Sequence, residues 1–179
     1  MGASLSWYAV RGKTPEMVLR DFGLRRAVSK EYRHTPFRGG PLPNGWFVMI
    51  HGRHEFTSDE MRHLSSACEV VACFVEEHVM VSRSACWKNG VQVWEVTHDS
   101  EESEHHLDIR GEPPAGFGAI RDRLTKQQKE DDEDGCVDFI FNIPVDLAEE
   151  VTGFNHLGSS DTGFGNFVKP TFLQRLFER

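Results

Sequence analysis

Histidine is the residue type in this chain best suited to chemistry, with nine copies in 179 residues. The densest group is the segment HGRHE at residues 51–55, at the end of an expected strand. A zinc or iron site needs about three ligands drawn from His, Asp or Glu. His51 and His54, joined by His78 or His98, could supply them. The sequence therefore predicts either one divalent transition metal held by His51, His54 and His78, or no cofactor, with these histidines exposed or hydrogen-bonded in loops.

A second group of polar residues interrupts an otherwise apolar stretch at Glu76-Glu77-His78. Strict alternation along a strand would turn Glu77 toward the core, where a carboxylate needs a partner or acquires a raised pKa. Arg83 points to the same expected face and could pair with it. One interpretation is a β-bulge with a structural ion pair, and the other is a ligand pocket.

The pocket hypothesis adds two tryptophans, Trp87 and Trp94, which flank the dipeptide Asn89-Gly90. Its predicted ligand-binding residues are Glu77, Arg83, Trp87 and Trp94. The ligand would be a polar small molecule. Tryptophans in strands more often belong to the core, so this alternative stays open.

Signatures of covalent or phosphate chemistry are missing from the sequence. Ser82 and Ser84 lie in a strand without the G-x-S-x-G elbow. Cys86 has no residue beside it to orient a Cys–His pair. No glycine-rich segment continues into a P-loop lysine. These absences favour a protein that works by binding over an enzyme.

The scaffold depends on the dipeptide Asn89-Gly90, which is typical of a two-residue type I′ hairpin turn. Counting outward from this turn pairs Lys88 with Val91 and Trp87 with Gln92. The same count places Trp87 and Trp94 on one inward face. The opposite face should be wet, because antiparallel sheets commonly expose one side to solvent.

The remaining elements follow from caps, breakers and periodicity. Thr14-Pro15 predicts a helix start, and Thr57 with Glu60 predicts a capping box. The other expected elements are strands at 4–10, 46–51, 107–109 and 137–143, helices after 114 and from 144 to 153, a loop at 33–45, a loop-rich segment at 155–170 and a short terminal helix at 171–179.

This order predicts an α+β fold, with a single mixed or antiparallel sheet, a long central β-hairpin and helices packed mainly on one face. A length of 179 residues suits one domain over 1–179.

Composition narrows the class of partner. The chain is 39% hydrophobic and 27% charged, as in a globular protein, and its formal net charge is −8. An acidic chain makes nucleic acid an unsuitable partner, because such binding needs clustered Lys and Arg. No apolar run approaches the ~20 residues that span a bilayer. Four cysteines without CxxC spacing and no secretory signal predict reduced thiols and a cytoplasmic location.

The sequence as a whole predicts an acidic intracellular α+β protein that binds a protein or small-molecule partner in an accessory, regulatory or immunity-type role. The alternative is a small metal-binding enzyme that uses His51, His54 and His78.

Overall fold

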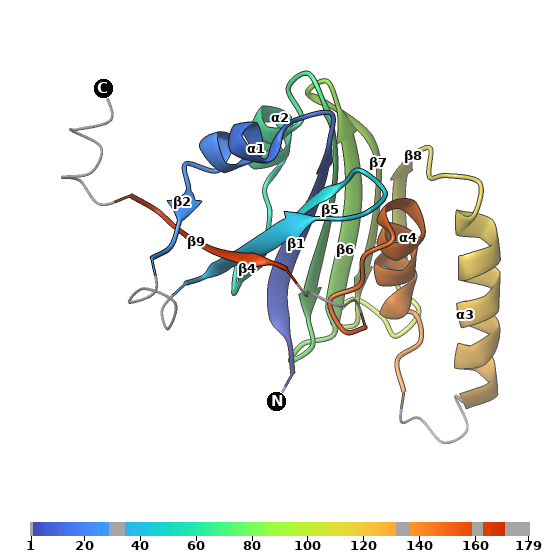
Figure 1. The fold of residues 1–179 in the computed structure, drawn as a ribbon. Helices are drawn as coiled ribbons and strands as arrows, with labels where there is room; N and C mark the ends of the chain where they lie inside the picture. The colour runs from blue at the N-terminus through green and yellow to red at the C-terminus, as the bar shows by residue number, and fades with distance from the viewer. Residues whose placement is uncertain (1, 29–34, 132–136, 159–162, 171–179) are drawn as a thin grey trace.

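Nine strands form one antiparallel sheet in this computed structural model, which describes residues 2–28, 35–131, 137–158 and 163–170 (Figure 1). The spatial order is β2-β9-β3-β4-β1-β5-β6-β7-β8. The strands are β1 (Ser4–Arg11), β2 (Arg25–Arg26), β3 (Phe37–Pro41), β4 (Phe47–Gly52), β5 (Glu69–Glu76), β6 (Val81–Lys88), β7 (Val91–Asp99), β8 (Asp108–Gly111) and β9 (Gly165–Val168). The single antiparallel sheet confirms the predicted α+β class.

The first strand, β1, lies at the centre of the sheet between β4 and β5. Its side chains alternate between two apolar layers. Trp7 and Ala9 belong to one buried cluster, and Tyr8 and Val10 belong to the other. Because both faces of β1 are covered, the strand has no wet side along its middle.

Two short helices begin at the caps that the sequence predicts. Thr14 accepts a hydrogen bond from the Met17 amide at the start of α1 (Pro15–Asp21). The capping box of α2 (Ser58–Leu64) is formed by Thr57 and Glu60. These helices lie together at one end of the sheet (Figure 1). Their buried side chains pack on the sheet face that carries Tyr8, and we call this cluster the α1–α2 core.

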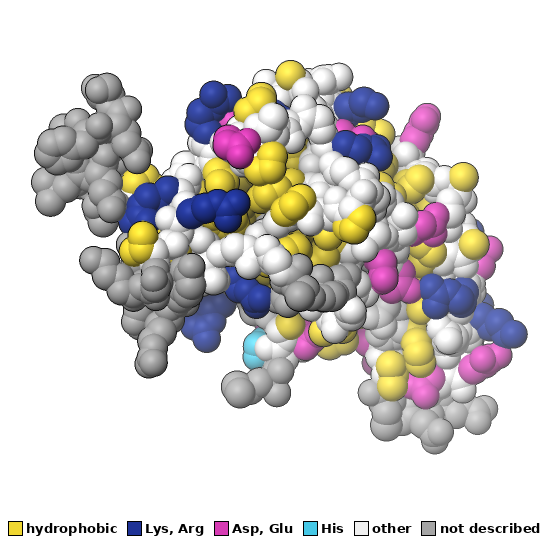
Figure 2. Space-filling view, viewed as in Figure 1, with side chains coloured by type: hydrophobic (Ala, Val, Ile, Leu, Met, Phe, Trp, Pro, Cys, Tyr) yellow, Lys and Arg dark blue, Asp and Glu magenta, His cyan; other side chains and the backbone are white. Residues whose placement is uncertain are grey.

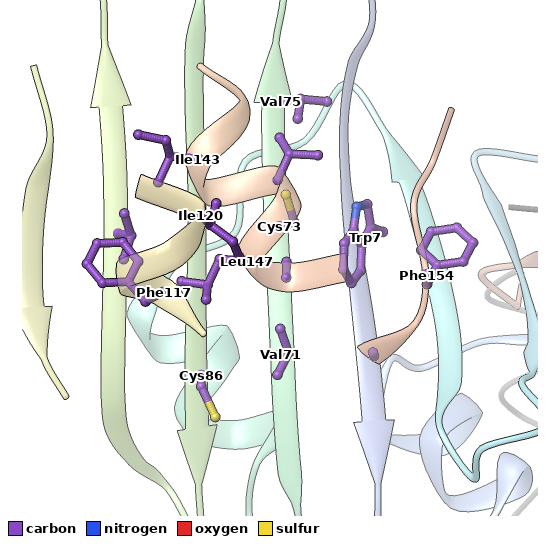
Figure 3. Close-up of a cluster of buried hydrophobic side chains, with 14 of the residues drawn as sticks. Trp7, Val71, Cys73, Val75, Cys86, Phe117, Ile120, Ile143, Leu147 and Phe154 are labelled. Carbon is purple, nitrogen blue, oxygen red and sulfur yellow. The ribbon is translucent and has the colours of Figure 1, made fainter. Parts of the chain in front are cut away.

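Two longer helices cover the opposite face of the sheet. They are α3 (Phe117–Asp131) and α4 (Asn142–Thr152), and α4 packs against β5, β6 and β7. Figure 3 shows Phe117 and Ile120 of α3 and Leu147 of α4 in the same buried cluster as Cys73 of β5. We call this cluster the α3–α4 core. The longer helices therefore share one face, and the two short helices lie on the other.

The β6–β7 hairpin turns at Asn89 and Gly90, whose φ values of 52° and 80° are those that a type I′ turn needs. The predicted pairs of Lys88 with Val91 and of Trp87 with Gln92 are confirmed. The register then shifts between Cys86 and Trp87, so that Cys86 lies opposite Trp94. The predicted register beyond this bulge is wrong.

The shift separates the two hairpin tryptophans. Val93 is the extra residue of β7, and one extra residue turns all later side chains of that strand to the other face. Trp87 belongs to the α1–α2 core, whereas Trp94 belongs to the α3–α4 core. The prediction that they share a face is therefore wrong.

Two expected elements have a different structure. The segment expected as a loop at 33–45 contains β3, which pairs with β4 and β9. The stretch expected as a strand at 137–143 is a turn that leads into α4. Side chains tie down this turn, because Gln128 accepts from the Phe139 amide at 2.7 Å and Asp138 accepts from the Phe141 amide at 2.9 Å.

At the C-terminal end, the loop-rich segment at 155–170 contains β9, and the terminal helix expected at 171–179 lies outside the described residues. No helix among the residues described is both long and apolar enough to cross a membrane.

Candidate functional site

The four residues predicted to bind a ligand do not come together. β5 and β6 are joined by a turn, which places Glu77 outside both strands. Its carboxylate accepts a hydrogen bond from the Ala3 amide at 2.7 Å. Arg83 pairs with Glu55 at 3.2 Å instead. With Trp87 and Trp94 on opposite faces, the predicted pocket of Glu77, Arg83, Trp87 and Trp94 is not formed.

The three predicted metal ligands are also divided. The rings of His51 and His54 are neighbours, with centroids 4.4 Å apart. His78 lies in the β5–β6 turn, where its Nδ1 is 2.5 Å from the Glu76 carboxylate. Within the described ranges, no group of three His, Cys, Asp or Glu side chains is arranged to hold a metal ion. The predicted site of His51, His54 and His78 is therefore not assembled.

A large hollow lies on the sheet face that also carries the α1–α2 core. Its volume is about 850 Å³. Side chains from four adjacent strands form the floor of the hollow. One row of cross-strand neighbours runs across these strands through Phe74, Arg83, Thr97 and Asp108. We call this surface the open sheet face. Its strand residues are Phe74, Glu76, Val81, Arg83, Glu95, Thr97, Asp99, Asp108 and Arg110.

The position of α2 explains why this part of the sheet is uncovered. The helix sits over the β6–β7 turn, where Ser65, its C-cap residue, accepts a hydrogen bond from the Gly90 amide at 3.2 Å. Arg62 of α2 lies over the Trp87 ring at 5.8 Å. The opposite ends of these strands, near the β5–β6 turn, extend beyond the helix and border the hollow.

Carboxylates dominate the charge around the hollow. Six line it, against two guanidinium groups and one imidazole. The six are Glu55, Glu76, Glu95, Asp99, Glu102 and Asp108. Hydrogen bonds from Ser4 and His78 hold the pKa of Glu76 below its usual value, so this carboxylate is ionised at neutral pH.

Internal ion pairs neutralise only part of this charge. Arg110 is 2.9 Å from Asp108 and 3.6 Å from Glu95. His106 is 3.2 Å from Glu102. Since each guanidinium carries one positive charge, two arginines cannot balance six carboxylates, and the hollow keeps a negative potential at neutral pH.

Arg83 of the open sheet face is held by several contacts. Its guanidinium lies over the Phe56 ring at 4.1 Å and donates to the Phe56 carbonyl. Its Nε is buried and has no hydrogen-bond partner among the described residues. The guanidinium held in this way presents a fixed positive charge at the hollow.

The sequence analysis named Arg83 as a candidate ligand-binding residue but did not bring it together with the other residues of the hollow. The bulge at Val93 shifts the register of β7 against β6, so the cross-strand neighbours beyond it could not be obtained by counting from the turn. One available indication was the alternation of Glu95, Thr97 and Asp99, which places three polar side chains on one side of β7.

The chain matches no known protein-family model, and no curated protein or solved structure shows significant similarity to it.

Proposed function

We propose that this protein acts by binding a basic protein partner on the open sheet face, in an accessory, regulatory or immunity-type role. The observation that supports this function best is the excess of carboxylates around a hollow of about 850 Å³ on an uncovered sheet. A partner with clustered Lys or Arg would complement this charge and gain a faster association rate.

The hollow offers different contacts for different parts of such a partner. Phe74 and Val81 provide apolar surface at the β5–β6 end. Glu95 and Asp99 of β7 provide acceptors for Lys or Arg side chains. The positive charge of Arg83 would select the orientation of the partner, because a cation of the partner placed over Arg83 would be repelled.

Affinity purification of the tagged protein from cells of its own species tests this proposal. The double variant Glu95→Gln/Asp99→Asn removes two negative charges from the open sheet face and keeps the side-chain shapes. We expect the unmodified protein to retain a basic partner and the double variant to bind it at least tenfold more weakly. Raising the salt concentration from 0.1 to 1 M shortens the Debye length from about 10 Å to about 3 Å and should also weaken the complex.

A matched control removes the same charge elsewhere. Asp122 and Glu130 are exposed on α3, where acidic and basic side chains are interspersed (Figure 2). The variant Asp122→Asn/Glu130→Gln should bind like the unmodified protein. Equal loss in both double variants, a partner that is acidic, or no retained partner would contradict the proposed function.

A further inference from the structure

A separate cavity lies between the sheet and the two short helices, and it shares no lining residue with the hollow of the open sheet face. Its volume is about 240 Å³. We call it the histidine cavity, and its walls include Tyr8, Phe22, Phe37, His51, His54 and Glu60. Sites for drug-sized molecules are typically about 300–1,000 Å³, so this cavity suits a smaller ring compound.

Stacked rings fix one wall of the histidine cavity. Phe37 of β3 and His51 of β4 are cross-strand neighbours, and their rings stack with centroids 4.1 Å apart and planes 27° apart. His51 in turn lies 4.4 Å from His54, with the planes 30° apart. The position of the His51 ring is therefore set by contacts with two other rings.

His51 is an uncharged imidazole at neutral pH. Burial, followed by the neighbouring His54, lowers its pKa to about 4. Neither ring nitrogen has a hydrogen-bond partner among the described residues, although the ring lines the cavity. A neutral imidazole offers one N–H donor and one nitrogen acceptor, so His51 can make a matched pair of contacts with a ligand.

The other polar groups of the cavity are held in fixed protonation states or positions. Burial, followed by the charge of Glu60, raises the pKa of Tyr8, so its phenol stays protonated. Both carboxylate oxygens of Glu60 lie within 3.1 Å of the His54 Nε2. The same carboxylate accepts from the Thr57 amide at 2.9 Å. The capping box of α2 thereby positions an acceptor at the cavity wall.

The charges around the histidine cavity are nearly balanced. Asp21 is paired with Lys13 at 2.7 Å. Glu60 and Lys169 carry opposite charges and both line the cavity. An aromatic anion would be opposed by Glu60, and an aromatic cation by Lys169, so neither sign of charge is favoured.

We propose that the histidine cavity binds a small, uncharged heteroaromatic ring of nucleobase size. Phe22, Phe37 and Leu64 provide apolar walls for a flat ring. His51 pairs with a donor and acceptor on the edge of that ring. Tyr8 and Glu60 provide a further donor and acceptor.

Calorimetry and saturation-transfer NMR at pH 7 test this proposal with five probes: adenine, cytosine, uracil, benzoate and benzylamine. We expect at least one of the three bases to bind with Kd below 1 mM and at least tenfold more tightly than either charged probe. His54 and His63 also line the cavity. For uracil, which does not ionise in this range, affinity should fall as the pH is lowered from 6 to 4 because protonation of His51 removes its acceptor nitrogen, and this fall should be smaller in His51→Phe.

Two variants test the assigned contacts. His51→Phe keeps a ring in the stack and removes both nitrogens, and Tyr8→Phe removes only a hydroxyl. We expect His51→Phe to weaken binding at least tenfold, and Tyr8→Phe to weaken it severalfold. His78→Phe, in the β5–β6 turn, is the matched control and should bind normally.

The proposal is overturned if no base binds the unmodified protein, if benzoate or benzylamine binds as tightly as the bases, or if folded His51→Phe binds like the control. Because the two sites share no residue, loss of the basic partner in Glu95→Gln/Asp99→Asn does not bear on this cavity.

Discussion

At Gly111, a positive φ of 71° lets the end of β8 approach β7 closely. A Cβ added there would lie 2.1 Å from the Val93 carbonyl oxygen and 3.0 Å from the Trp94 Cα. Both contacts are with backbone atoms, which cannot move aside as a side chain can. Val93 is the extra residue of the β7 bulge, and its carbonyl accepts from the Glu112 amide at 3.1 Å. Gly111 is therefore required by the bulge.

Gly111→Ala should lower the free energy of unfolding by about 1–3 kcal/mol, because it adds a clash to a left-handed backbone conformation. Urea denaturation measures this change. Gly118→Ala is the control, since a Cβ at Gly118 of α3 meets nothing within 4 Å, and it should be neutral or stabilising by up to about 1 kcal/mol. Equal stability of both variants would contradict this account of Gly111.

His51 makes a separate contribution to the pH dependence of stability. Its pKa of about 4 in the folded protein lies below the ordinary value of 6.5. The unfolded chain therefore binds more protons between these values, and stability is lost as the pH falls through this range. The melting temperature should drop between pH 6.5 and 4.5, and it should drop less in His51→Phe. Parallel pH profiles for the two proteins would exclude a buried neutral His51.

Several single-residue features could be predicted from the sequence because they depend on local chemistry. The capping box of Thr57 and Glu60 and the turn at Asn89-Gly90 are set by residues within a few positions of each other. The pairing of His54 with Glu60 could not be predicted in this way. It depends on how α2 packs against the end of β4.

Among the elements, the turn before α4 is held by a buried ion pair that no local pattern indicates. His98 of β7 is fully buried, with its Nε2 at 2.9 Å from Asp138 and its Nδ1 at 2.8 Å from the His106 carbonyl. Burial alone would lower the pKa of His98, but the hydrogen bonds to Asp138 and His106 outweigh it and raise the pKa. Burial would likewise raise the pKa of Asp138, but the hydrogen bond from His98 lowers it.

Asp138→Asn should lower the free energy of unfolding by about 3–5 kcal/mol, because it leaves His98 without its anionic partner. Because the pKa of His98 is raised on folding, this residue stabilises the folded state fully below pH 6.5. The stabilisation is lost as the pH rises through the pKa of His98 in the folded protein. Because the pKa of Asp138 is lowered on folding, this residue stabilises the folded state above pH 3.8, and the stabilisation is lost as the pH falls below that value. The difference between wild type and variant in urea denaturation should be largest from pH 4 to 6.5. A difference that grows above pH 8 would contradict this pairing.

The strand expected at 137–143 shows why an apolar run is a weak indicator of element type. Short buried helix starts and short buried strands have the same composition. Here Ile140 and Phe141 are buried because the turn packs between the sheet and α3. The bulge in β7 could not be predicted from the sequence either, because an inserted residue changes the register without any change in β-propensity.

Over the whole molecule, two buried layers enclose the described cysteines. Cys68, Cys73 and Cys86 are free and buried. Burial raises the pKa of all three thiols, that of Cys86 to about 12. Since the thiolate is the reactive form, folding protects these residues from alkylation.

Iodoacetamide at pH 8 should therefore label these three cysteines at the rate at which the protein unfolds. Peptide mass spectrometry after timed labelling measures each site, and protein in 8 M urea provides the fully reactive reference. Rapid native labelling of Cys73 or Cys86 would mean that the α3–α4 core opens without global unfolding.

The α+β class and the single sheet could be predicted because they depend on the order and periodicity of elements along the chain. The open sheet face could not be predicted, since it depends on where two short helices end relative to four strands. The acidic net charge of the chain can be read from the sequence, but the place where carboxylates gather around a hollow cannot.

The bulge in β7 also gives the molecule a natural optical reporter. Trp7, Trp46 and Trp94 share the layer under α3 and α4, whereas Trp87 belongs to the layer under α1 and α2. A chain that keeps Trp87 and has phenylalanine at the other three positions would emit from one layer alone, and a chain with only Trp94 would emit from the other. Fluorescence recorded during denaturation would then show whether the two sides of the sheet come apart together or in sequence.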